Sequence, residues 1–358
     1  MEITIGIEMR DEYKRLEVAK GALKLVRDFM LVQPGENVVI NYDTCVDERV
    51  VKALAEAVYA IDAVPSVIYT PTGTGFYAQS IPPAPLAAAV GSADVWIELA
   101  YAPIMHSEAY RQAVDVKGAR YICATGLDVE MLVNCITKID IDKVIELGEY
   151  FKEKIESAAE IVVTCNKGTN LRGRMGGRKV RHSGIKAKKK GYPVMIPGQT
   201  SWCPLEDSIE GTLVFDGAIF PPENIGILRN PVKLEFESGR IVDISGAGPE
   251  AKIFKDWIDS FGDPNMYRLA HFSQGFNPGV TKITGRIVED ERVFGCMEFG
   301  IGSQGVAIGG AHWDAASHTD GVVLYPTIVL DGEPLEKDGI YVDAKAVELC
   351  RELGVKGY

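Results

Sequence analysis

Residues 37–70 read NVVINYDTCVDERVVKALAEAVYAIDAVPSVIYT, and they determine the fold that we expect for the first part of the chain. The β-branched run at 37–41 is typical of a buried strand, and the segment 66–70 has the same character. The segment 48–60 between them has the pattern of a helix. A strand, a helix and a second strand in close succession indicate a parallel sheet that is covered by helices.

The same alternation continues on both sides of this stretch. A predicted helix over 12–31 precedes it, and the segments that follow are helix 83–91, strand 94–99, helix 108–114, strand 120–124 and helix 139–156. Beyond them the texture changes to short β-rich runs at 161–165, 212–215, 232–236, 240–245 and 322–330, with one helix at 249–261. We therefore predict two domains: a parallel α/β domain at 1–157 and a largely antiparallel, β-rich domain at 158–358.

The composition narrows the class of protein. A length of 358 residues suits two domains, and a hydrophobic content of 46% provides ample core material. A net charge of −12 argues against binding to nucleic acids or to anionic membranes, because both need clustered cations. The one basic run, 172–190, is either a solvated face or a rim that attracts an acidic substrate. We see neither a transmembrane stretch nor a signal peptide, and we expect a cytoplasmic protein.

The chemistry that we expect is concentrated in residues 271–320, which hold three of the five histidines. His318-Thr319-Asp320 begins an apolar run, and in a strand His318 and Asp320 would share a face about 6.6 Å apart. Two such side chains can converge on one cation, and His271 would complete a two-histidine, one-carboxylate set. The second domain is thus predicted to bind metal. The alternative is that His-Thr-Asp is an ordinary polar strand start.

Two further positions carry side chains suited to catalysis. His106 lies just past the predicted strand 94–99, and ligands of parallel sheets bind beyond the carboxyl ends of the strands. We interpret His106 as a proton carrier, or else as a surface or helix-capping residue. His312 and Trp313 lie in a glycine-rich loop before the predicted metal strand. They could contact substrate, with Trp313 as an apolar wall, or His312 could cap a turn.

Three segments resemble a known family: 206–216 (EDSIEGTLVFD), 263–278 (DPNMYRLAHFSQGFNP) and 309–320. They look like stretches of the 2,5-dihydroxypyridine 5,6-dioxygenases, a branch of the M29 aminopeptidase clan, and the resemblance extends along nearly the whole chain. It implies one iron(II) held by the matching residues His271, His318 and Asp320, and it implies His106 as the catalytic base. A second active-site histidine of that family, expected near Met195, has no counterpart here. The clan generally forms homo-oligomers.

The peptidase branch of the clan binds two metals, and this chain departs from its pattern. Gln199 and His271 stand where the resemblance implies glutamates, and Glu298 stands where it implies a histidine. The exchanges at Gln199 and His271 remove negative charge that two divalent ions would need, so we favour one metal. Glu298 also departs from the dioxygenase branch. It could be a further ligand, orient a ligating histidine from outside the ligand set, or contact substrate; Gln199 is another possible substrate contact.

From these residues we expect a mononuclear, non-haem iron(II) dioxygenase that opens a hydroxylated aromatic or N-heteroaromatic ring with O2. Its partners would be a small-molecule substrate and O2, with neither nucleic acid nor membrane. The first alternative is a metallo-aminopeptidase or amidohydrolase that uses one or two ions of zinc, cobalt or manganese. The second alternative is a non-catalytic binding protein on the same scaffold.

Overall fold

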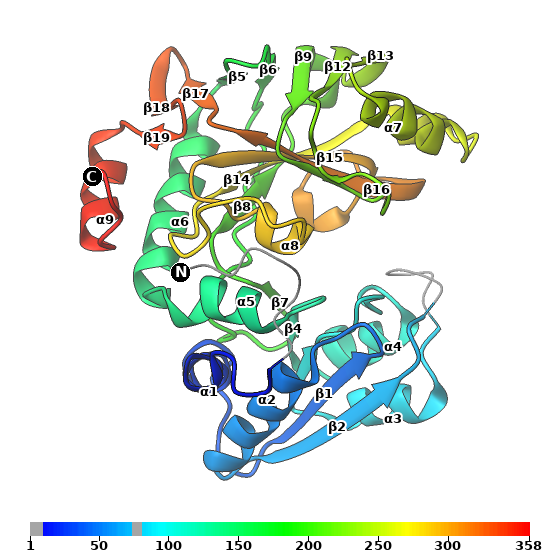
Figure 1. Ribbon diagram of the computed structural model, residues 1–358, viewed down its shortest axis with the longest axis vertical. Coiled ribbons are helices and arrows are strands. Elements are labelled where there is room, and N and C mark those ends of the chain that lie inside the picture. The colour runs from blue at the N-terminus through cyan, green and yellow to red at the C-terminus, as the bar shows by residue number, and fades with distance from the viewer. Residues whose placement is uncertain (1–9, 74–80) are drawn as a thin grey trace. The chain divides into compact units, whose positions relative to one another are not determined.

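The computed structural model describes residues 10–73 and 81–358. The chain forms two compact units, one from residues 1–139 with 185–196 and one from residues 140–184 with 197–358 (Figure 1). The first contains a parallel sheet and the second two antiparallel sheets, which confirms the predicted fold class. Helix α6 (Ile141–Ser157) groups with the second unit, whereas we predicted it at the end of the first domain. A boundary between independently folding domains near residue 157 stays a prediction.

The sheet of the first unit has five parallel strands in the order β2-β1-β3-β4-β7. They are β1 (Asn37–Asp43), β2 (Val64–Thr70), β3 (Val95–Glu98), β4 (Arg120–Cys123) and β7 (Pro193–Met195). The first four lie where the β-branched runs predicted them. The fifth, β7, was not predicted, since it is only three residues long and pairs with a strand far away in the sequence.

Among the described residues, the helices of the first unit lie where the alternation predicted them, except for a short helix at 129–132 that was not predicted. They are α1 (Arg15–Leu23), α2 (Glu48–Ala60), α3 (Ala84–Ser92), α4 (Glu108–Tyr110) and α5 (Val129–Leu132). Helical turns continue α1 to Phe29 and α4 to Val116. Asp47 fixes the start of α2, because its side chain accepts a hydrogen bond from the backbone amide of Arg49.

The second unit contains two antiparallel sheets. The six-stranded sheet has the order β11-β10-β16-β15-β14-β8, with β8 (Gln199–Trp202), β10 (Ala218–Phe220), β11 (Gly226–Ile227), β14 (Leu269–Gly275), β15 (Cys296–Gln304) and β16 (Trp313–Leu324). The eight-stranded sheet has the order β13-β12-β9-β6-β5-β17-β18-β19, with β5 (Glu160–Thr164), β6 (Asn170–Arg174), β9 (Glu210–Phe215), β12 (Val232–Glu237), β13 (Arg240–Ser245), β17 (Thr327–Leu330), β18 (Glu333–Lys337) and β19 (Ile340–Tyr341). Its helices besides α6 are α7 (Pro249–Asp259), α8 (Ile287–Asp290) and α9 (Ala344–Glu352).

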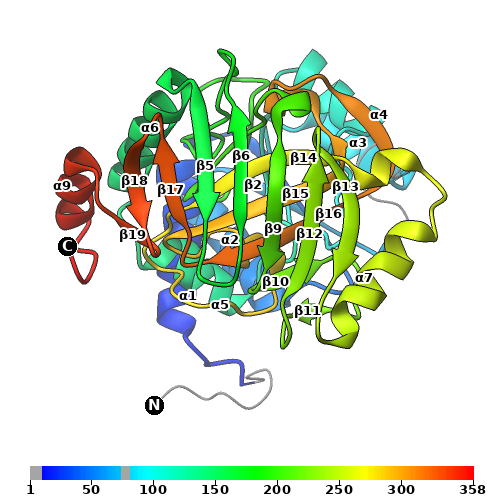
Figure 2. The same ribbon diagram turned by 90° about the horizontal axis from the view of Figure 1, so that it is seen from above.

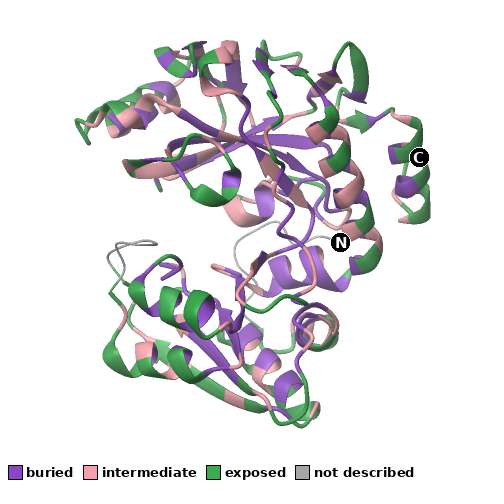
Figure 3. Cartoon of the chain, turned by 180° about the vertical axis from the view of Figure 1, so that it is seen from behind, coloured by how far each residue is buried: buried purple, intermediate pink, exposed green. Residues whose placement is uncertain are grey.

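The two sheets of this unit stack with their strands crossing, as Figure 2 shows. Phe215 of β9 packs against Gly321 of β16, where a Cβ atom would lie only 2.4 Å from the phenyl ring. In the middle of the six-stranded sheet, β14 and β15 are buried along most of their length (Figure 3). The apolar core between the sheets therefore fixes which face of β14, β15 and β16 points away from it.

One predicted strand is wrong in its extent. The apolar run 322–330 was expected to be a single strand, but β16 ends at Leu324 and β17 begins at Thr327 in the other sheet. Tyr325 has a φ of 50°, and Pro326 follows it, so the chain turns there and changes sheets. In the described ranges, no helix is long and apolar enough to span a membrane.

Candidate metal centre

Three neighbouring strands of the six-stranded sheet bring the predicted ligands together. His271 lies on β14 and His318 and Asp320 lie on β16, with β15 between these two strands. Gly300 of β15 is paired with both His271 and Asp320. Since paired residues share a face of a sheet and alternate residues of a strand do too, the three ligand side chains project from one face.

The ligand atoms are close enough to hold one ion. One nitrogen of each histidine and one carboxylate oxygen of Asp320 all lie within 4.8 Å of one another. Asp320 Oδ1 is 2.9 Å from His318 Nε2 and 3.7 Å from His271 Nε2. The two imidazole rings are nearly parallel, with an angle of 14° and centroids 5.2 Å apart. This spacing and donor set fit a first-row divalent ion with open coordination positions.

Gly300 makes the room for these two rings. A Cβ atom at this position would lie 2.2 Å from Cε1 of His271 and 2.8 Å from Cε1 of His318. Both distances are far below a van der Waals contact, so any other residue here would displace the histidines. The close approach of the two histidine rings therefore depends on glycine at position 300, on the same strand as Glu298.

The protonation of His318 is fixed by a contact with the backbone. Its Nδ1 lies 2.8 Å from the carbonyl oxygen of Ser303, and because a carbonyl only accepts, Nδ1 must be the donor. Nε2 is then the nitrogen that faces Asp320 and would face a metal. A hydrogen bond of this kind orients the ligating histidines of metalloproteins.

Burial controls the charges of the ligands. Burial, with His318 nearby, lowers the pKa of His271 to about 3, so this ring is the neutral imidazole that metals require. Burial would raise the pKa of Asp320, but contact with His318 lowers it below its ordinary value, and the carboxylate stays ionised. For His318, Asp320 outweighs burial and raises the pKa.

Glu298 lies beside the cluster, two residues before Gly300 on β15, and is fully buried. Its Oε2 is 3.1 Å from His271 Nε2 and accepts a hydrogen bond of 3.3 Å from Gln199. Its Oε1 has no hydrogen-bond partner within the described ranges. Burial, with Asp320 and Glu291 nearby, raises the pKa of Glu298 well above its ordinary value. A buried acid with a vacant oxygen is suited to bonding a ligand or substrate group placed against it.

Gln199 joins Glu298 to a second acid, the partly buried Glu291, which the sequence reasoning missed. Its amide nitrogen donates to Glu291 Oε2 at 2.9 Å, and Arg292 forms an ion pair with the same oxygen at 3.2 Å. Burial raises the pKa of Glu291 to about 7. The run of charges at 289–292 resembles a solvated turn in the sequence, so it gave no signal that its side chains were buried.

His312 and Trp313 lie outside the three-ligand cluster. His312 has a φ of 58°, and its Nδ1 lies 2.7 Å from the carbonyl oxygen of Gln304. Trp313 donates its indole hydrogen to the carbonyl of Gly302 at 2.8 Å, and the ring lines a pocket whose ten wall residues include none of the three ligands. Their contact with substrate stays a prediction.

His106 belongs to the first unit and follows β3, as predicted. It is exposed, has a φ of 66°, and its ring centroid is 5.5 Å from that of Tyr110. Ser107 caps α4 by accepting a hydrogen bond from the amide of Tyr110. The cap belongs to Ser107 and not to His106, which leaves the role of the histidine as a base a prediction.

Comparisons with known proteins agree on the fold. A solved structure of 2,5-dihydroxypyridine dioxygenase from Pseudomonas putida superposes with a TM-score of 0.74 at 20% identity, covering 95% of this chain and 99% of that one. Wild-type AmpT from Thermus thermophilus superposes with a TM-score of 0.65 at 14% identity, covering 92% and 100%. At these identities the likeness concerns the fold alone.

The sequence comparisons are more specific. A curated 2,5-dihydroxypyridine 5,6-dioxygenase from Pseudomonas putida is 32% identical over 160 residues, which are 42% of this chain and 41% of that protein. The match thus spans about two fifths of the length of the curated relative. The family model described as 2,5-dihydroxypyridine 5,6-dioxygenase matches residues 22–343. Because that match extends over most of the 358 residues, the chain belongs to the 2,5-dihydroxypyridine 5,6-dioxygenase family.

Proposed function

We propose that this protein is a ring-opening dioxygenase that uses one iron(II) and O2 to cleave a hydroxylated N-heteroaromatic ring of the 2,5-dihydroxypyridine type. His271, His318 and Asp320 would hold the metal. The observation that carries the proposal is the cluster itself. Two imidazole rings and one carboxylate converge on one face of the sheet, and the lack of a side chain at Gly300 leaves room for both rings. The family match supports this class of reaction and of substrate.

The donor set is what a ring-opening dioxygenase needs. A ferrous ion bound by two histidines and one carboxylate keeps positions open for substrate and O2, and it supplies the redox chemistry that O2 requires. His318 is oriented by the Ser303 carbonyl, so its Nε2 lone pair points at the site. Both atoms of O2 enter the ring-opened product, so the reaction consumes neither a second oxidant nor an external reductant.

The acidic groups behind the cluster have a different task. Glu298 lies beside His271 Nε2 and accepts a hydrogen bond from Gln199, so it stands next to the ligand nitrogen, where it can bond a polar group of the substrate. Gln199 in turn is held by Glu291. We infer that this chain of contacts holds Glu298 in place beside the cluster, and that Glu298 remains outside the set of metal ligands. His106 would act as the base that removes a proton from a ring hydroxyl before cleavage.

The decisive experiment measures the metal content of anaerobically purified protein and then the O2 uptake with 2,5-dihydroxypyridine. We expect about one iron per chain and substrate-dependent O2 uptake, as for other sites with this ligand set. His318→Ala should lose both. His312→Ala is the matched control for metal content, because this histidine bonds to the Gln304 carbonyl outside the cluster. A wild-type protein with bound iron but without O2 uptake on any hydroxylated pyridine would refute the proposal.

The same experiment tests the two alternatives. The buried carboxylate of Glu298 and the partly buried carboxylate of Glu291 beside the cluster are the observation that favours a hydrolase with a second ion. Such an enzyme would contain up to two zinc, cobalt or manganese ions and would release amines from peptides under nitrogen. A non-catalytic protein would contain no metal after purification. The homo-oligomer that we expect from the sequence stays a prediction, and size-exclusion chromatography with light scattering tests it.

A further inference from the structure

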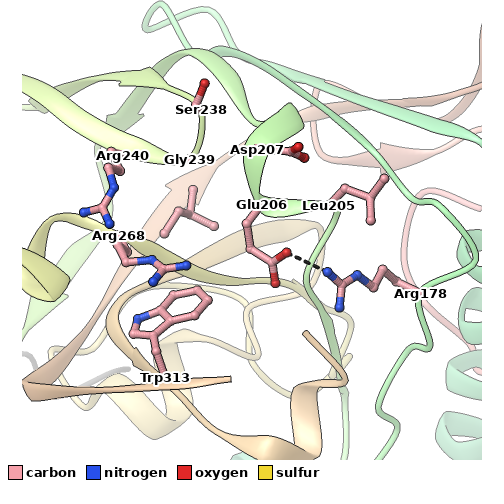
Figure 4. Close-up of a pocket in the computed structure, with 10 residues that line it drawn as sticks. Arg178, Leu205, Glu206, Asp207, Ser238, Gly239, Arg240, Arg268 and Trp313 are labelled. Atoms are coloured by element: carbon pink, nitrogen blue, oxygen red, sulfur yellow. Dashed lines mark hydrogen bonds and ion pairs between the residues drawn. The ribbon is translucent and has the colours of Figure 1, made fainter. Parts of the chain in front are cut away.

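A pocket of about 390 Å³ lies in the second unit, and three arginines line it (Figure 4). Two turns form part of its wall, one at 205–207 and one at 238–240 between β12 and β13. The rest of the wall consists of Arg178, Arg268, Leu269 and Trp313. Gly239 allows the two turns to approach each other, since a Cβ atom there would be 2.3 Å from the carbonyl oxygen of Glu206. The pocket is thus built into the fold.

Two of the arginines are neighbours on one side of the pocket. Arg240 and Arg268 form an isolated antiparallel bridge, so their side chains leave adjacent points of the backbone (Figure 4). The guanidinium of Arg268 lies 3.6 Å from the centroid of the Trp313 ring, and Arg240 donates to the carbonyl of Pro264 at 3.2 Å. Across residues 10–73 and 81–358, neither guanidinium forms an ion pair with a carboxylate.

The opposite wall does not supply the missing negative charge. Glu206 is engaged by Arg178 at 2.6 Å, and it also accepts hydrogen bonds from the backbone amide of Ala311 and from Gln304. The other acidic wall residue, Asp207, is exposed. Burial, together with the nearby charge of Arg240, lowers the pKa of Arg268 below its ordinary value. The pocket therefore has three guanidinium groups but only two carboxylates, and of these Glu206 is already paired with Arg178 and Asp207 is exposed to solvent.

We propose that this pocket is a binding site for a small, doubly charged oxyanion, which Arg240 and Arg268 grip between them. Guanidinium forks match the oxygens of phosphate and carboxylate groups, and stacking on Trp313 holds one fork in place before binding. Such a concentration of cations in a chain with a net charge of −12 focuses anions on this one place. The proposal does not rest on the proposed catalytic function.

The pocket lies at the start of the two strands that carry the proposed metal ligands. Arg268 immediately precedes β14, which carries His271, and Trp313 is the first residue of β16, which carries His318 and Asp320. An anion in the pocket would therefore touch the start of both strands that carry the ligands. The pocket is a second site for a charged small molecule, apart from the three-ligand cluster.

The test is calorimetric titration of the full-length protein with inorganic phosphate at low ionic strength, and in parallel with succinate. Arg240→Ala and Arg268→Ala should each weaken binding by about tenfold or more, because each removes a charge-assisted, two-pronged contact. Arg172→Ala is the matched control, since it removes an exposed arginine of β6 and should change binding less than about twofold. Asp207→Asn should tighten binding, because it removes a repulsive charge from the wall.

The outcomes are separable. Tighter binding of phosphate than of succinate would identify the ligand group as phosphoryl, and the reverse would identify it as a dicarboxylate; either supports the site. Failure of the wild-type protein to bind either anion at millimolar concentration would overturn the proposal. So would an equal loss in Arg172→Ala and Arg240→Ala, which would mean a general attraction to positive charge. If Arg268→Ala does not fold, Arg240→Ala carries the test alone, because Arg240 is exposed.

Discussion

The histidines of this protein are held in place in two different ways. His271 and His318 stand on β14 and β16, which both pair with β15, so the ladders of backbone hydrogen bonds on the two sides of β15 fix their spacing. His106 stands at the end of a loop in the first unit, with a left-handed backbone. That loop is tied down by two buried acids: Asp43 accepts a hydrogen bond from the amide of Ala102, and Glu98 accepts one from the amide of Ile104.

The difference separates two physical kinds of positioning. The strand-held cluster can tolerate changes around it but not within it, because its geometry follows from register and from the space at Gly300. The loop-held histidine depends on side chains that do not themselves touch its ring. We therefore expect the largest effect from filling the space at Gly300 and a smaller one from removing the side chain of His106. Changing Glu98, which supports the loop of His106, should have the smallest effect.

Filling the cluster should have the largest effect. Gly300→Ala places a methyl group 2.2 Å from His271 and 2.8 Å from His318, so the two rings can no longer converge. We expect metal affinity to fall by at least about hundredfold, at the upper end of what disturbed ligand orientation costs, and O2 uptake to fall with it. Metal content by plasma mass spectrometry and metal titration of the apoprotein measure the effect.

The matched control is Gly305→Ala. Gly305 follows directly after β15, has a φ of −71°, and has no atom within 4 Å of where a Cβ would lie. It should bind metal as the wild-type protein does. Circular dichroism of both variants shows whether the sheets are intact. A folded Gly300→Ala protein with a full complement of metal would contradict the geometry of the site.

Removing the loop histidine should leave the metal in place. His106→Ala is expected to lower kcat by about 10²- to 10⁴-fold, the range for loss of a general base, with unchanged metal content. The pH–rate profile should lose the limb that reports this base, and added imidazole should restore part of the rate. An unaltered kcat in His106→Ala would eliminate this residue as the base.

Much of the fold was predictable, because local pattern and tertiary structure agree. The helix predicted over 48–60 has these same bounds in the structure, and the first four parallel strands lie at their β-branched runs. The pairing of strands that lie far apart in the sequence was harder to predict. β7 is a three-residue strand that joins the sheet about seventy residues after β4, its neighbour, and its composition carries no strand signal.

The grouping of the three proposed metal ligands was predictable for a different reason than the structure around them. His318 and Asp320 share a face by the two-residue period of a strand, which the sequence displays. The match with His271 depends on the register of β15, which is interrupted by irregularities between Leu269 and His271 and between Gly302 and Gln304. Bulges of this kind re-aim side chains near active sites, and no local pattern announces them.

Loosening the support of the loop should have the smallest and most specific effect. Glu98 is fully buried, and burial raises the pKa of its carboxyl group from 4.5 to about 7, although the hydrogen bonds from Ile104 and Tyr121 act in the other direction and Asp43 adds to the rise. A folded-state pKa above the unfolded value means that the folded protein binds the proton more tightly. The stability that this group contributes is therefore complete below pH 4.5 and is lost as the pH rises through about 7.

Glu98→Gln removes this titration and keeps one oxygen that can accept the Ile104 amide. Between pH 5 and pH 8 the wild-type protein should lose about 2.5 kcal/mol more of its free energy of unfolding than the variant does, the linkage expected for a pKa shift of this size. Urea unfolding at both pH values, followed by circular dichroism, measures it. Glu56→Gln, which alters an exposed carboxyl of α2, should follow the wild-type pH dependence. Equal pH dependence in all three proteins would mean that Glu98 does not titrate in this range.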